Sequence, residues 1–407
     1  MYTHKEIKQM DNLFPESPDF SLIQRLSAFE PFSTEAINFL DDLSKKLNKY
    51  HSIKSYSDVA TFAFFCRKGN LLKLKENFLS SDKQVMLGRG IVFHIAPSNV
   101  PVNFAYSFLI GILSGNINIV RVPSKSFEQV DIICHAIKDI ESEGKHNFIL
   151  ERLFIIRYDR DNFEATSFFS SICDIRVIWG GDETIKSIRE HKLQARSFDI
   201  TFADRYSICA ICSGAFIEEK NPEALVRFFY NDTFLFDQNA CTSPHLVVWV
   251  GEEDDSQKAR LIFWDFLHEF AEAKYNFQPI MGVDKLTNFY LQAVNFNDIK
   301  KSYGNSNVLW VSKLNYLETN VDSFRCASGY FSEYFANSLQ QINDIITTKY
   351  QTLAYFGFSK NELQEFILKN KPHGIDRIVP IGKTSDFSLI WDGYNLISAL
   401  SRNCEIL

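Results

Sequence analysis

Apolar residues recur at three- and four-residue intervals through the first eighty residues, which is the spacing of amphipathic helices. The segment TEAINFLDDLSKKLNKY, residues 34–50, shows the pattern best, with Ser33 or Thr34 as its expected N-cap. Beyond residue 85 the pattern changes to short apolar runs that are rich in β-branched and aromatic residues, typical of buried strands. We therefore expect a helical region over residues 20–79, followed by a region built on strands.

From residue 88 to residue 191 strand and helix patterns alternate. Buried strands are predicted within GRGIVFHIAP (88–97), NINIVRVPS (116–124), LFIIRY (153–158) and DIRVIWGG (174–181). Helices are predicted between them, at 103–115, 126–144 and 182–191, and Ser124 is expected to cap the second of these. Such alternation predicts βαβ units and a largely parallel sheet.

The second half of the chain repeats this style. Strands are predicted in DRYSICAICSG (204–214), PHLVVWVG (244–251) and TLAYFGF (352–358), with helices over 221–236 and 256–275. The expected fold class is therefore α/β with two domains. The first covers residues 1–204 and the second covers 205–371, while a C-terminal segment of about 372–407 is expected to pack back on the first.

Composition limits the classes of function. The chain has 407 residues, of which 45% are hydrophobic and 23% charged, and its net charge of −7 gives no polycationic surface for nucleic acid. No apolar run is long enough to cross a bilayer, and the N-terminal stretch 1–14 lacks the apolar region of a signal peptide. We expect a cytoplasmic protein whose eight scattered cysteines are thiols.

One cysteine stands in an unusual setting. Cys241 lies in FLFDQNACTSPHLVVWV (234–250), in a polar loop between a predicted helix and a predicted strand. Free cysteine is usually buried, and a nucleophilic thiol must be ionised although its ordinary pKa is roughly 8.5. The preceding helix presents its negative end, so activation has to come from backbone N–H groups, nearby side chains or a bound cation. His245 is a candidate base, and an incidental loop cysteine is the alternative reading.

Other candidates lie at predicted strand ends, where open α/β sheets bind ligands. Asn99 offers an amide that suits a developing oxyanion, Arg121 and Lys125 suit a phosphate, and the paired Gly180 and Gly181 allow close approach of a pyrophosphate. Ordinary turns and a solvated rim explain the same residues without a ligand. The pair Cys209 and Cys212 has no partner at metal-binding spacing, so no metal site is expected.

Several of these stretches together resemble the long-chain fatty acyl reductases of bacterial luminescence systems, a branch of the aldehyde dehydrogenase superfamily. The similarity spans about residues 85–405 and is carried by five stretches in the same order. These are GRGIVFHIAPSNVPVNFAYSFLIGILSGNINIVRVPS, IRVIWGGDE, FADRYSICAI, FDQNACTSPHLVVW and DRIVPIGKTSDFSLIWDGYNLISALSR. The resemblance implies an aldehyde-dehydrogenase-like fold of two Rossmann-like parallel-sheet domains with a helical N-terminal region.

The resemblance also implies roles for individual residues. Cys241 would be the acyl-accepting nucleophile, and Asn99 would be the asparagine of the oxyanion hole. Nucleotide-binding residues would be Ala96, Pro97, Ser98, Arg121, Ser124, Lys125, Gly180 and Gly181. The water-activating glutamate of hydrolytic superfamily members is replaced within DITFADRYS, with Thr201 or a neighbour at that position. Its absence favours reduction over hydrolysis of the acyl-enzyme.

The predicted activity is therefore reduction of an acyl thioester to an aldehyde through an acyl-cysteine, with hydride from NADPH. NADH stays an alternative, and the acyl donor is either acyl-CoA or an acyl-donor protein. A homo-oligomer is left open as well, because superfamily members commonly form dimers or tetramers. Two rival functions are a cysteine-dependent acyltransferase or thioesterase without a redox step, and a non-catalytic subunit.

Overall fold

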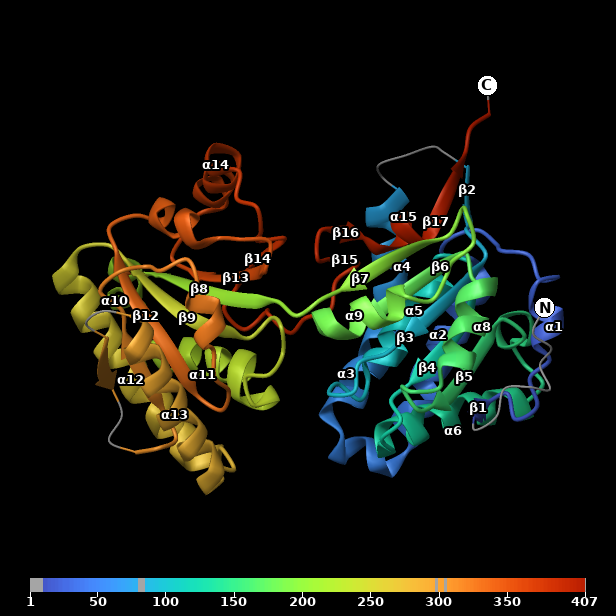
Figure 1. Cartoon of the computed structure of the whole chain (residues 1–407), viewed down its shortest axis with the longest axis horizontal. Coiled ribbons are helices and arrows are strands. Elements are labelled where there is room, and N and C mark those ends of the chain that lie inside the picture. The colour runs from blue at the N-terminus through green and yellow to red at the C-terminus, as the bar shows by residue number, and fades with distance from the viewer. Residues whose placement is uncertain (1–9, 80–84, 297–298, 304–305, 407) are drawn as a thin grey trace. The chain divides into compact units, whose positions relative to one another are not determined.

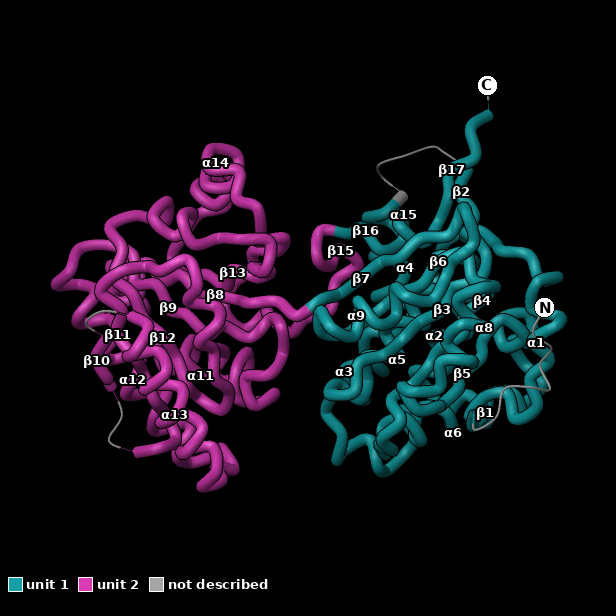
Figure 2. Tube along the Cα trace, viewed as in Figure 1, with its two compact units in different colours: residues 1–203, 394–407 teal, residues 204–393 magenta. Residues whose placement is uncertain are grey.

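The computed structural model describes residues 10–79, 85–296, 299–303 and 306–406, so residues 1–9 of the N-terminal stretch considered above lie outside it. The chain divides into two units (Figures 1 and 2). Unit 1 comprises residues 1–203 and 394–407, and unit 2 comprises residues 204–393.

Unit 1 is built on a six-stranded sheet in the order β1-β5-β4-β3-β6-β7. The strands are parallel except β1, which runs antiparallel to β5. Nearly every residue of the four central strands is buried, as expected for strands covered on both faces. The strands are β1 (Met10–Phe14), β3 (Ile91–Ile95), β4 (Ile117–Val122), β5 (Leu153–Tyr158), β6 (Ile175–Trp179) and β7 (Phe198–Phe202). The four predicted strands are confirmed, whereas β1 and β7 were not predicted.

The helices of unit 1 that were predicted within 20–79, 103–115, 126–144 and 182–191 are confirmed, whereas those at 147–150 and 163–172 were not predicted. The Ser33 hydroxyl accepts a hydrogen bond from the Ala36 N–H at 3.1 Å and caps α2, as expected. The cap expected from Ser124 is wrong, because α6 begins four residues later and its N-cap Phe127 has no side-chain acceptor. The helices are α1 (Phe20–Ile23), α2 (Thr34–Lys49), α3 (Ser57–Phe65), α4 (Lys68–Leu79), α5 (Asn103–Leu113), α6 (Glu128–Ser142), α7 (Asn147–Leu150), α8 (Phe163–Ile172), α9 (Asp182–Arg189) and α15 (Leu396–Leu400).

Unit 2 holds a seven-stranded sheet in the order β10-β11-β12-β9-β8-β13-β14, parallel except for β10. The strands are β8 (Tyr206–Cys212), β9 (Pro244–Val250), β10 (Lys300–Tyr303), β11 (Trp310–Lys313), β12 (Tyr330–Ala336), β13 (Tyr350–Phe356) and β14 (Arg377–Pro380). Strand β12 was not predicted, since the carboxylate of Glu333 interrupts its apolar run. That buried carboxylate is satisfied by Arg260 at 2.7 Å and by the indole N–H groups of Trp249 and Trp264.

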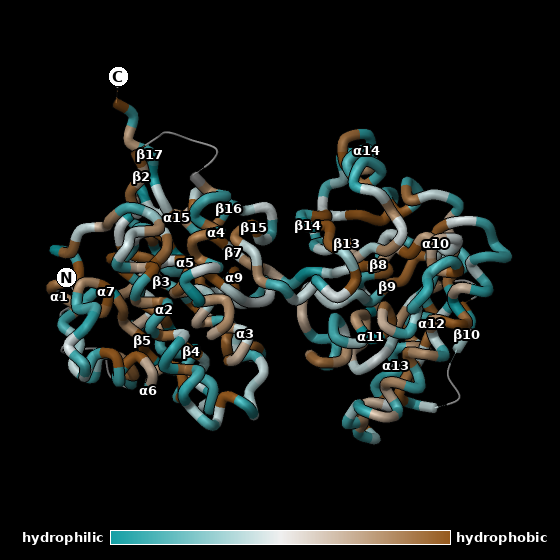
Figure 3. Tube along the Cα trace, turned by 180° about the vertical axis from the view of Figure 1, so that it is seen from behind, coloured by the Kyte–Doolittle hydropathy of each residue, from teal (hydrophilic) through white to brown (hydrophobic). Residues whose placement is uncertain are grey.

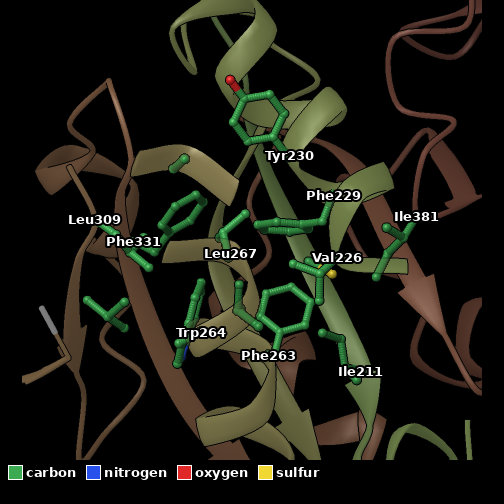
Figure 4. Packing of buried hydrophobic residues seen from close by; sticks show 14 of the residues in the cluster. Ile211, Val226, Phe229, Tyr230, Phe263, Trp264, Leu267, Leu309, Phe331 and Ile381 are labelled. Atoms are coloured by element: carbon green, nitrogen blue, oxygen red, sulfur yellow. The ribbon is translucent and has the colours of Figure 1, made fainter. Parts of the chain in front are cut away.

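Helices cover both faces of this sheet. On one face α11 (Pro222–Thr233) and α12 (Glu253–Lys274) pack against the strands through a cluster of buried aromatic and aliphatic side chains (Figure 4). Each such side chain contributes roughly 1.5–3 kcal/mol when fully buried. The other face is covered by the 3₁₀ helix η5 (Leu339–Ile345) and by α14 (Lys360–Asn370). The remaining helices are α10 (Ser213–Ile217) and α13 (Pro279–Asn295).

The C-terminal part of the chain is shared between the units. Strand β14 extends the sheet of unit 2 beside β13, whereas β17 (Ser401–Cys404) pairs antiparallel with β2 (Val85–Gly88) in unit 1. The segment expected to return to the first domain is therefore divided, with 394–407 in unit 1 and 372–393 in unit 2. Within the described residues, no helix has the length and apolarity needed to cross a membrane.

Candidate functional site

The first group of candidate residues lies at the carboxyl edge of the unit 1 sheet. The strand order reverses around β3, whose neighbours are β4 on one side and β6 on the other. Residues 96–99 follow β3, and Gly180 and Gly181 follow β6. In open α/β sheets the ligand crevice lies at this reversal point, outside the carboxyl ends of the strands. The structure thus brings these two predicted segments to one edge of one sheet.

A chain of buried hydrogen bonds fixes both strand ends. The Trp179 indole N–H donates to the Ser107 hydroxyl at 3.0 Å, and that hydroxyl lies 2.7 Å from His94 Nδ1. His94 Nε2 lies 3.0 Å from Oδ1 of the Asn118 side-chain amide. Burial lowers the pKa of His94 to about 4, so the ring is neutral and accepts at Nδ1 while it donates at Nε2. The loops after β3 and β6 therefore start from rigid positions.

The loops themselves are open to solvent. Ala96 is buried and Pro97 is half-buried, while Ser98 and Asn99 are exposed. Gly181 is the N-cap of α9, and a Cβ added there would meet no atom within 4 Å. The N–H groups of the first helical turn suit an anion in that space. The carboxylates of Asp182 and Glu183 lie in the same turn and oppose it.

The two cations predicted for a nucleotide phosphate differ in their surroundings. Arg121 is buried in β4, where its Nη2 donates to the Tyr158 carbonyl at 3.2 Å and its guanidinium lies over the Tyr158 ring. Lys125 is exposed after the strand end, with its Nζ 5.2 Å from the centre of the Phe127 ring. Ser124 between them is also exposed. Lys125 is thus the better placed of the two cations to meet a ligand phosphate.

The second group lies in unit 2, in the loop that carries Cys241. Asp237 and Gln238 both adopt positive φ, of 50° and 60°, which folds the loop back toward the start of β9. The Gln238 carbonyl oxygen accepts from the N–H groups of Gly329 and Tyr330, and its amide nitrogen donates to the carbonyls of Pro244 and Tyr330. This buried side chain therefore anchors the loop with four hydrogen bonds, three to Gly329 and Tyr330 at the start of β12 and one to Pro244 at the start of β9.

A buried carboxylate holds the other side of the loop. The Ser243 hydroxyl donates to the Asp232 carbonyl at 2.8 Å. The Asp232 carboxylate accepts from the N–H groups of Gly382 at 2.6 Å and Thr384 at 3.2 Å. Burial raises the pKa of Asp232 to about 6 against these hydrogen bonds. Asp232 thus joins the cysteine loop to a segment about 140 residues away in the chain.

Cys241 is held at both its backbone and its thiol. The Ser207 hydroxyl donates to the Cys241 carbonyl at 2.6 Å and accepts from the Thr352 N–H at 3.2 Å. The Gln351 side chain hydrogen-bonds the thiol, and its amide nitrogen also donates to the Asp392 carboxylate. The pairing registers of β8 with β9 and of β13 with β8 shift here, and such irregularities are over-represented beside active sites.

The surroundings keep the thiol protonated. Burial raises the pKa of Cys241 to about 12, and the neighbouring Asp392 carboxylate acts in the same direction. The hydrogen bond from Gln351 and the positive charge of Arg205 act against that shift without overcoming it. Arg205 itself is engaged by the Asp376 carboxylate and the Tyr350 carbonyl. The thiol therefore needs a proton acceptor, and Asp392 is the nearby carboxylate whose own pKa burial raises.

His245 is placed less favourably for the role of a base. Its ring is buried in β9, stacks on Tyr206 with 5.6 Å between ring centres, and bonds the backbone of Cys326. Burial lowers the pKa of His245 to about 3, and its Nδ1 has no hydrogen-bond partner among the described residues. Of the predicted cysteine pair, Cys209 is part of the core and Cys212 is half-buried. Within the described part of the chain, no three potential ligands gather to hold a metal ion.

Sequence reasoning missed the residues that surround Cys241. Ser207, Gln351 and Asp392 come from three separated segments, and nothing in their local sequence marks them as neighbours of a thiol. The one signal lay in WDGY, residues 391–394, which contains Asp392 and was already among the most specific stretches of the resemblance. The polar loop alone did not predict that Asp232 and Gln238 would anchor it.

Comparisons with known proteins agree with this architecture. A model of the acyl-CoA reductase (LuxC) family matches residues 70–403. Long-chain acyl-protein thioester reductase 2 from Photobacterium leiognathi is 23% identical over 245 residues, which is 57% of this chain. The match spans 48% of that relative, so the chain covers about half the length of the curated protein it matches.

Solved structures show the same fold at low identity. Lactaldehyde dehydrogenase from Escherichia coli superposes with a TM-score of 0.63 at 9% identity, covering 94% of this chain and 87% of that one. Aldehyde dehydrogenase 21 from Physcomitrella patens gives 0.64 at 8% identity, with coverage of 94% and 87%. Glyceraldehyde-3-phosphate dehydrogenase GapN from Methanocaldococcus jannaschii, complexed with NADP, gives 0.59 at 14%, with coverage of 91% and 88%. The expected aldehyde-dehydrogenase-like α/β fold is confirmed.

Proposed function

The chain belongs to the acyl-CoA reductase (LuxC) family, and from this premise we propose that it reduces an acyl thioester to an aldehyde through an acyl group carried on Cys241. The observation that carries the proposal is the setting of this cysteine. Its loop is anchored by Gln238 and Asp232, its carbonyl is held by Ser207, and its thiol is hydrogen-bonded by Gln351. Such a fixed thiol among polar side chains suits a nucleophile better than an incidental loop residue.

Acyl transfer requires the thiol proton to move. We assign this task to Asp392, which shares the Gln351 amide with the thiol and whose pKa is raised by burial. Asp392 accepts the proton as the Cys241 sulfur attacks the acyl carbonyl. The bond from that carbonyl to the donor sulfur breaks, and the proton passes to the departing thiolate. The donor leaves as a thiol and the acyl group stays on Cys241, so atoms and charges balance.

The carboxyl edge of unit 1 has the features of a dinucleotide site. Gly181 is the N-cap of α9 and has no atom within 4 Å of an added Cβ, and Lys125 offers an exposed cation for a 2′-phosphate. Reduced nicotinamide, when bound, supplies the hydride that converts the acyl group to an aldehyde. We propose NADPH as the preferred cofactor, with NADH as the alternative, and we assign Ala96, Pro97, Ser98, Ser124 and Gly180 to the same site.

Two donors are proposed for the oxyanion that develops during reduction. These are the exposed amide of Asn99 and the backbone N–H of Cys241, and the loss of one such donor typically costs about 100- to 1000-fold in rate. The resemblance places the water-activating glutamate of hydrolytic superfamily members within DITFADRYS, where this chain has Thr201 or a neighbour. Thr201 lies in β7, and the carboxylate of that strand, Asp199, is paired with Arg176 at 2.8 Å. This pairing favours reduction over hydrolysis.

The acyl donor is proposed from the comparisons. The family description names acyl-CoA, and the name of the Photobacterium relative indicates an acyl group delivered by a protein thioester. Both donors present the same chemical group to Cys241, because each carries its acyl chain on sulfur. The proposal therefore covers either, and the first experiment uses the simpler donor.

Intact-mass spectrometry tests the proposal directly. The protein is incubated with acyl-CoA of several chain lengths, first without nucleotide and then with NADPH. We expect an adduct of one acyl group that is absent from Cys241→Ala and present in the matched control Cys212→Ala, and we expect NADPH to discharge it as aldehyde. An adduct that NADPH leaves unchanged, or that decays to free acid, would favour the acyltransferase or thioesterase alternative. No adduct with any donor contradicts the proposal.

A further inference from the structure

Helix α13 (Pro279–Asn295) turns its polar side inward. Lys285 is fully buried, and its Nζ donates to the carbonyls of Asn307 and Val308, both at 2.8 Å. Gln292 is also fully buried, accepting from the Tyr330 hydroxyl at 2.6 Å and donating to the Ser332 hydroxyl at 3.0 Å. Turning the helix about its axis would leave these groups buried without partners, at a cost of several kcal/mol. The rotation of α13 is therefore fixed.

The outward side of the same helix is apolar. Five exposed apolar residues form one stripe along the helix, with exposed fractions of 60% at Ile280, 57% at Val283, 61% at Tyr290, 55% at Leu291 and 85% at Val294, and Leu286, 43% exposed, lies beside it. The hydropathy view colours α13 in a mixture of brown apolar and teal polar residues (Figure 3). A row of exposed apolar side chains of this kind on a folded protein marks an interaction site.

The order of residues in the stripe is symmetric about Thr287. Counting outward from that residue, Ile280 corresponds to Val294 and Val283 corresponds to Leu291. Two copies of the helix that cross antiparallel at Thr287 would therefore place aliphatic side chains against aliphatic side chains. The Thr287 hydroxyl donates to the Val283 carbonyl of its own helix at 2.9 Å, so a small residue with a satisfied hydroxyl stands at the centre.

The one charge on this side fits the same arrangement. Asp284 is exposed and corresponds to Tyr290 in the symmetric pattern. An antiparallel pair would bring each carboxylate to the hydroxyl of the opposite tyrosine, which can donate a hydrogen bond to it. In this pair each residue meets its own copy only at Thr287, where the twofold axis would lie. The two Asp284 carboxylates would therefore stay apart, on opposite sides of that axis. A surface with this symmetry suits the isologous contact of a twofold dimer.

We propose that the α13 face, defined by Ile280, Val283, Thr287, Tyr290, Leu291 and Val294, is a self-association surface that binds the α13 face of a second copy of this chain. The contact is antiparallel, with its twofold axis at Thr287. It is independent of the reductase activity proposed above, because it rests on surface residues of α13 and not on the Cys241 loop.

The test measures the oligomeric state of the full-length chain by analytical ultracentrifugation over a range of concentrations. The wild type should form a dimer. The pair of substitutions Val283→Glu with Leu291→Glu should raise the dimer dissociation constant at least about 100-fold, because two carboxylates would then meet at each end of the contact. The pair Val283→Glu with Leu291→Lys should restore association, because the symmetric pattern brings each glutamate to a lysine.

Two further variants complete the test. Leu261→Glu with Ile262→Glu adds the same charge to α12 at residues that are 48% and 40% exposed, and it should leave the dimer intact. Thr287→Cys should form a covalent dimer under oxidising conditions at a rate far above the wild type, since its two copies face each other at the axis. A monomeric wild type, or a dimer that is indifferent to both charge pairs and to Thr287→Cys, would overturn the proposal.

Discussion

The two sheets present their candidate residues in opposite ways. In unit 1 they follow directly from strand ends, and Ser98, Asn99, Lys125 and Gly181 are exposed. In unit 2 the candidate cysteine is half-buried and held by side chains from distant segments, and burial raises the pKa of its thiol to about 12. The unit 1 edge is open and its residues are local in sequence, whereas the unit 2 edge is half-buried and assembled from distant segments.

This difference matches the chemistry proposed for each edge. A dinucleotide is bound largely by backbone N–H groups and a few cations, which loops at strand ends can offer without burial. A nucleophile must be oriented and must exchange a proton, so it needs neighbours whose positions are fixed by packing. Substitutions at each edge therefore test whether its activity depends on these features.

The largest effect is expected at the unit 2 edge, which carries Cys241. Replacing Cys241 by serine should lower the rate of NADPH consumption with acyl-CoA at least about 1000-fold. The reason is that the serine hydroxyl is a far weaker nucleophile than the cysteine thiol. The matched change Cys212→Ser, in β8, should leave the rate within about twofold. Steady-state absorbance of the nicotinamide measures both, and similar rates for the two variants would remove Cys241 from the reaction.

The next effect concerns the open edge. Asn99→Ala should lower the rate of reduction about 100- to 1000-fold through loss of one oxyanion donor. The neighbouring exposed residue offers a control, since Val100→Ala removes a side chain of the same loop without an amide. Equal effects of the two substitutions on turnover would indicate that the loop matters for its shape and not for the Asn99 amide.

Much of the fold could be predicted from the sequence because its strands are continuous apolar runs. The four central strands of unit 1 and strands β8, β9 and β13 were recognised in this way. Strand β12 was missed because buried Glu333 interrupts its apolar pattern. The ion pair that compensates the Glu333 carboxylate could not be foreseen, since its partner Arg260 lies 73 positions away in the chain. Helix α13 was missed for the inverse reason, since its buried side is polar and its exposed side apolar.

The candidate site divides in the same way. Residues that follow a strand end directly, such as Asn99 and Gly181, could be proposed from local pattern and resemblance. The groups that hold Cys241 could not, because Ser207, Gln351 and Asp392 meet only once the sheet is formed. Arg121 shows the limit of local reading, since its sequence position suggests a phosphate ligand while the fold directs it to the Tyr158 carbonyl.

A smaller effect is expected from the carboxylate that anchors the cysteine loop. The pKa of Asp232 is raised from 3.8 to about 6, so between these values the folded protein holds a proton that the unfolded chain has released. Folding stability from this group therefore decreases as pH rises from about 4 to about 6, by about 3 kcal/mol in total. Asp232→Asn cannot ionise and should lack this decrease. Urea unfolding of both proteins across that range measures it, and parallel stability curves would contradict the shift.

The smallest effect is expected at the unit 1 edge, where a substitution tests which cation binds the 2′-phosphate of NADPH. Lys125 is exposed, whereas the Arg121 guanidinium is occupied by Tyr158, so Lys125→Ala should raise KM for NADPH about tenfold, equivalent to about 1.4 kcal/mol. KM for NADH should change little, because NADH lacks the 2′-phosphate. Lys125→Arg should keep most of the preference for NADPH over NADH, because it retains the positive charge. This variant therefore separates the effect of losing the charge from the effect of losing the lysine side chain. Equal changes for both nucleotides would place Lys125 against the shared pyrophosphate instead, and the open edge would then bind NADH and NADPH without distinguishing them.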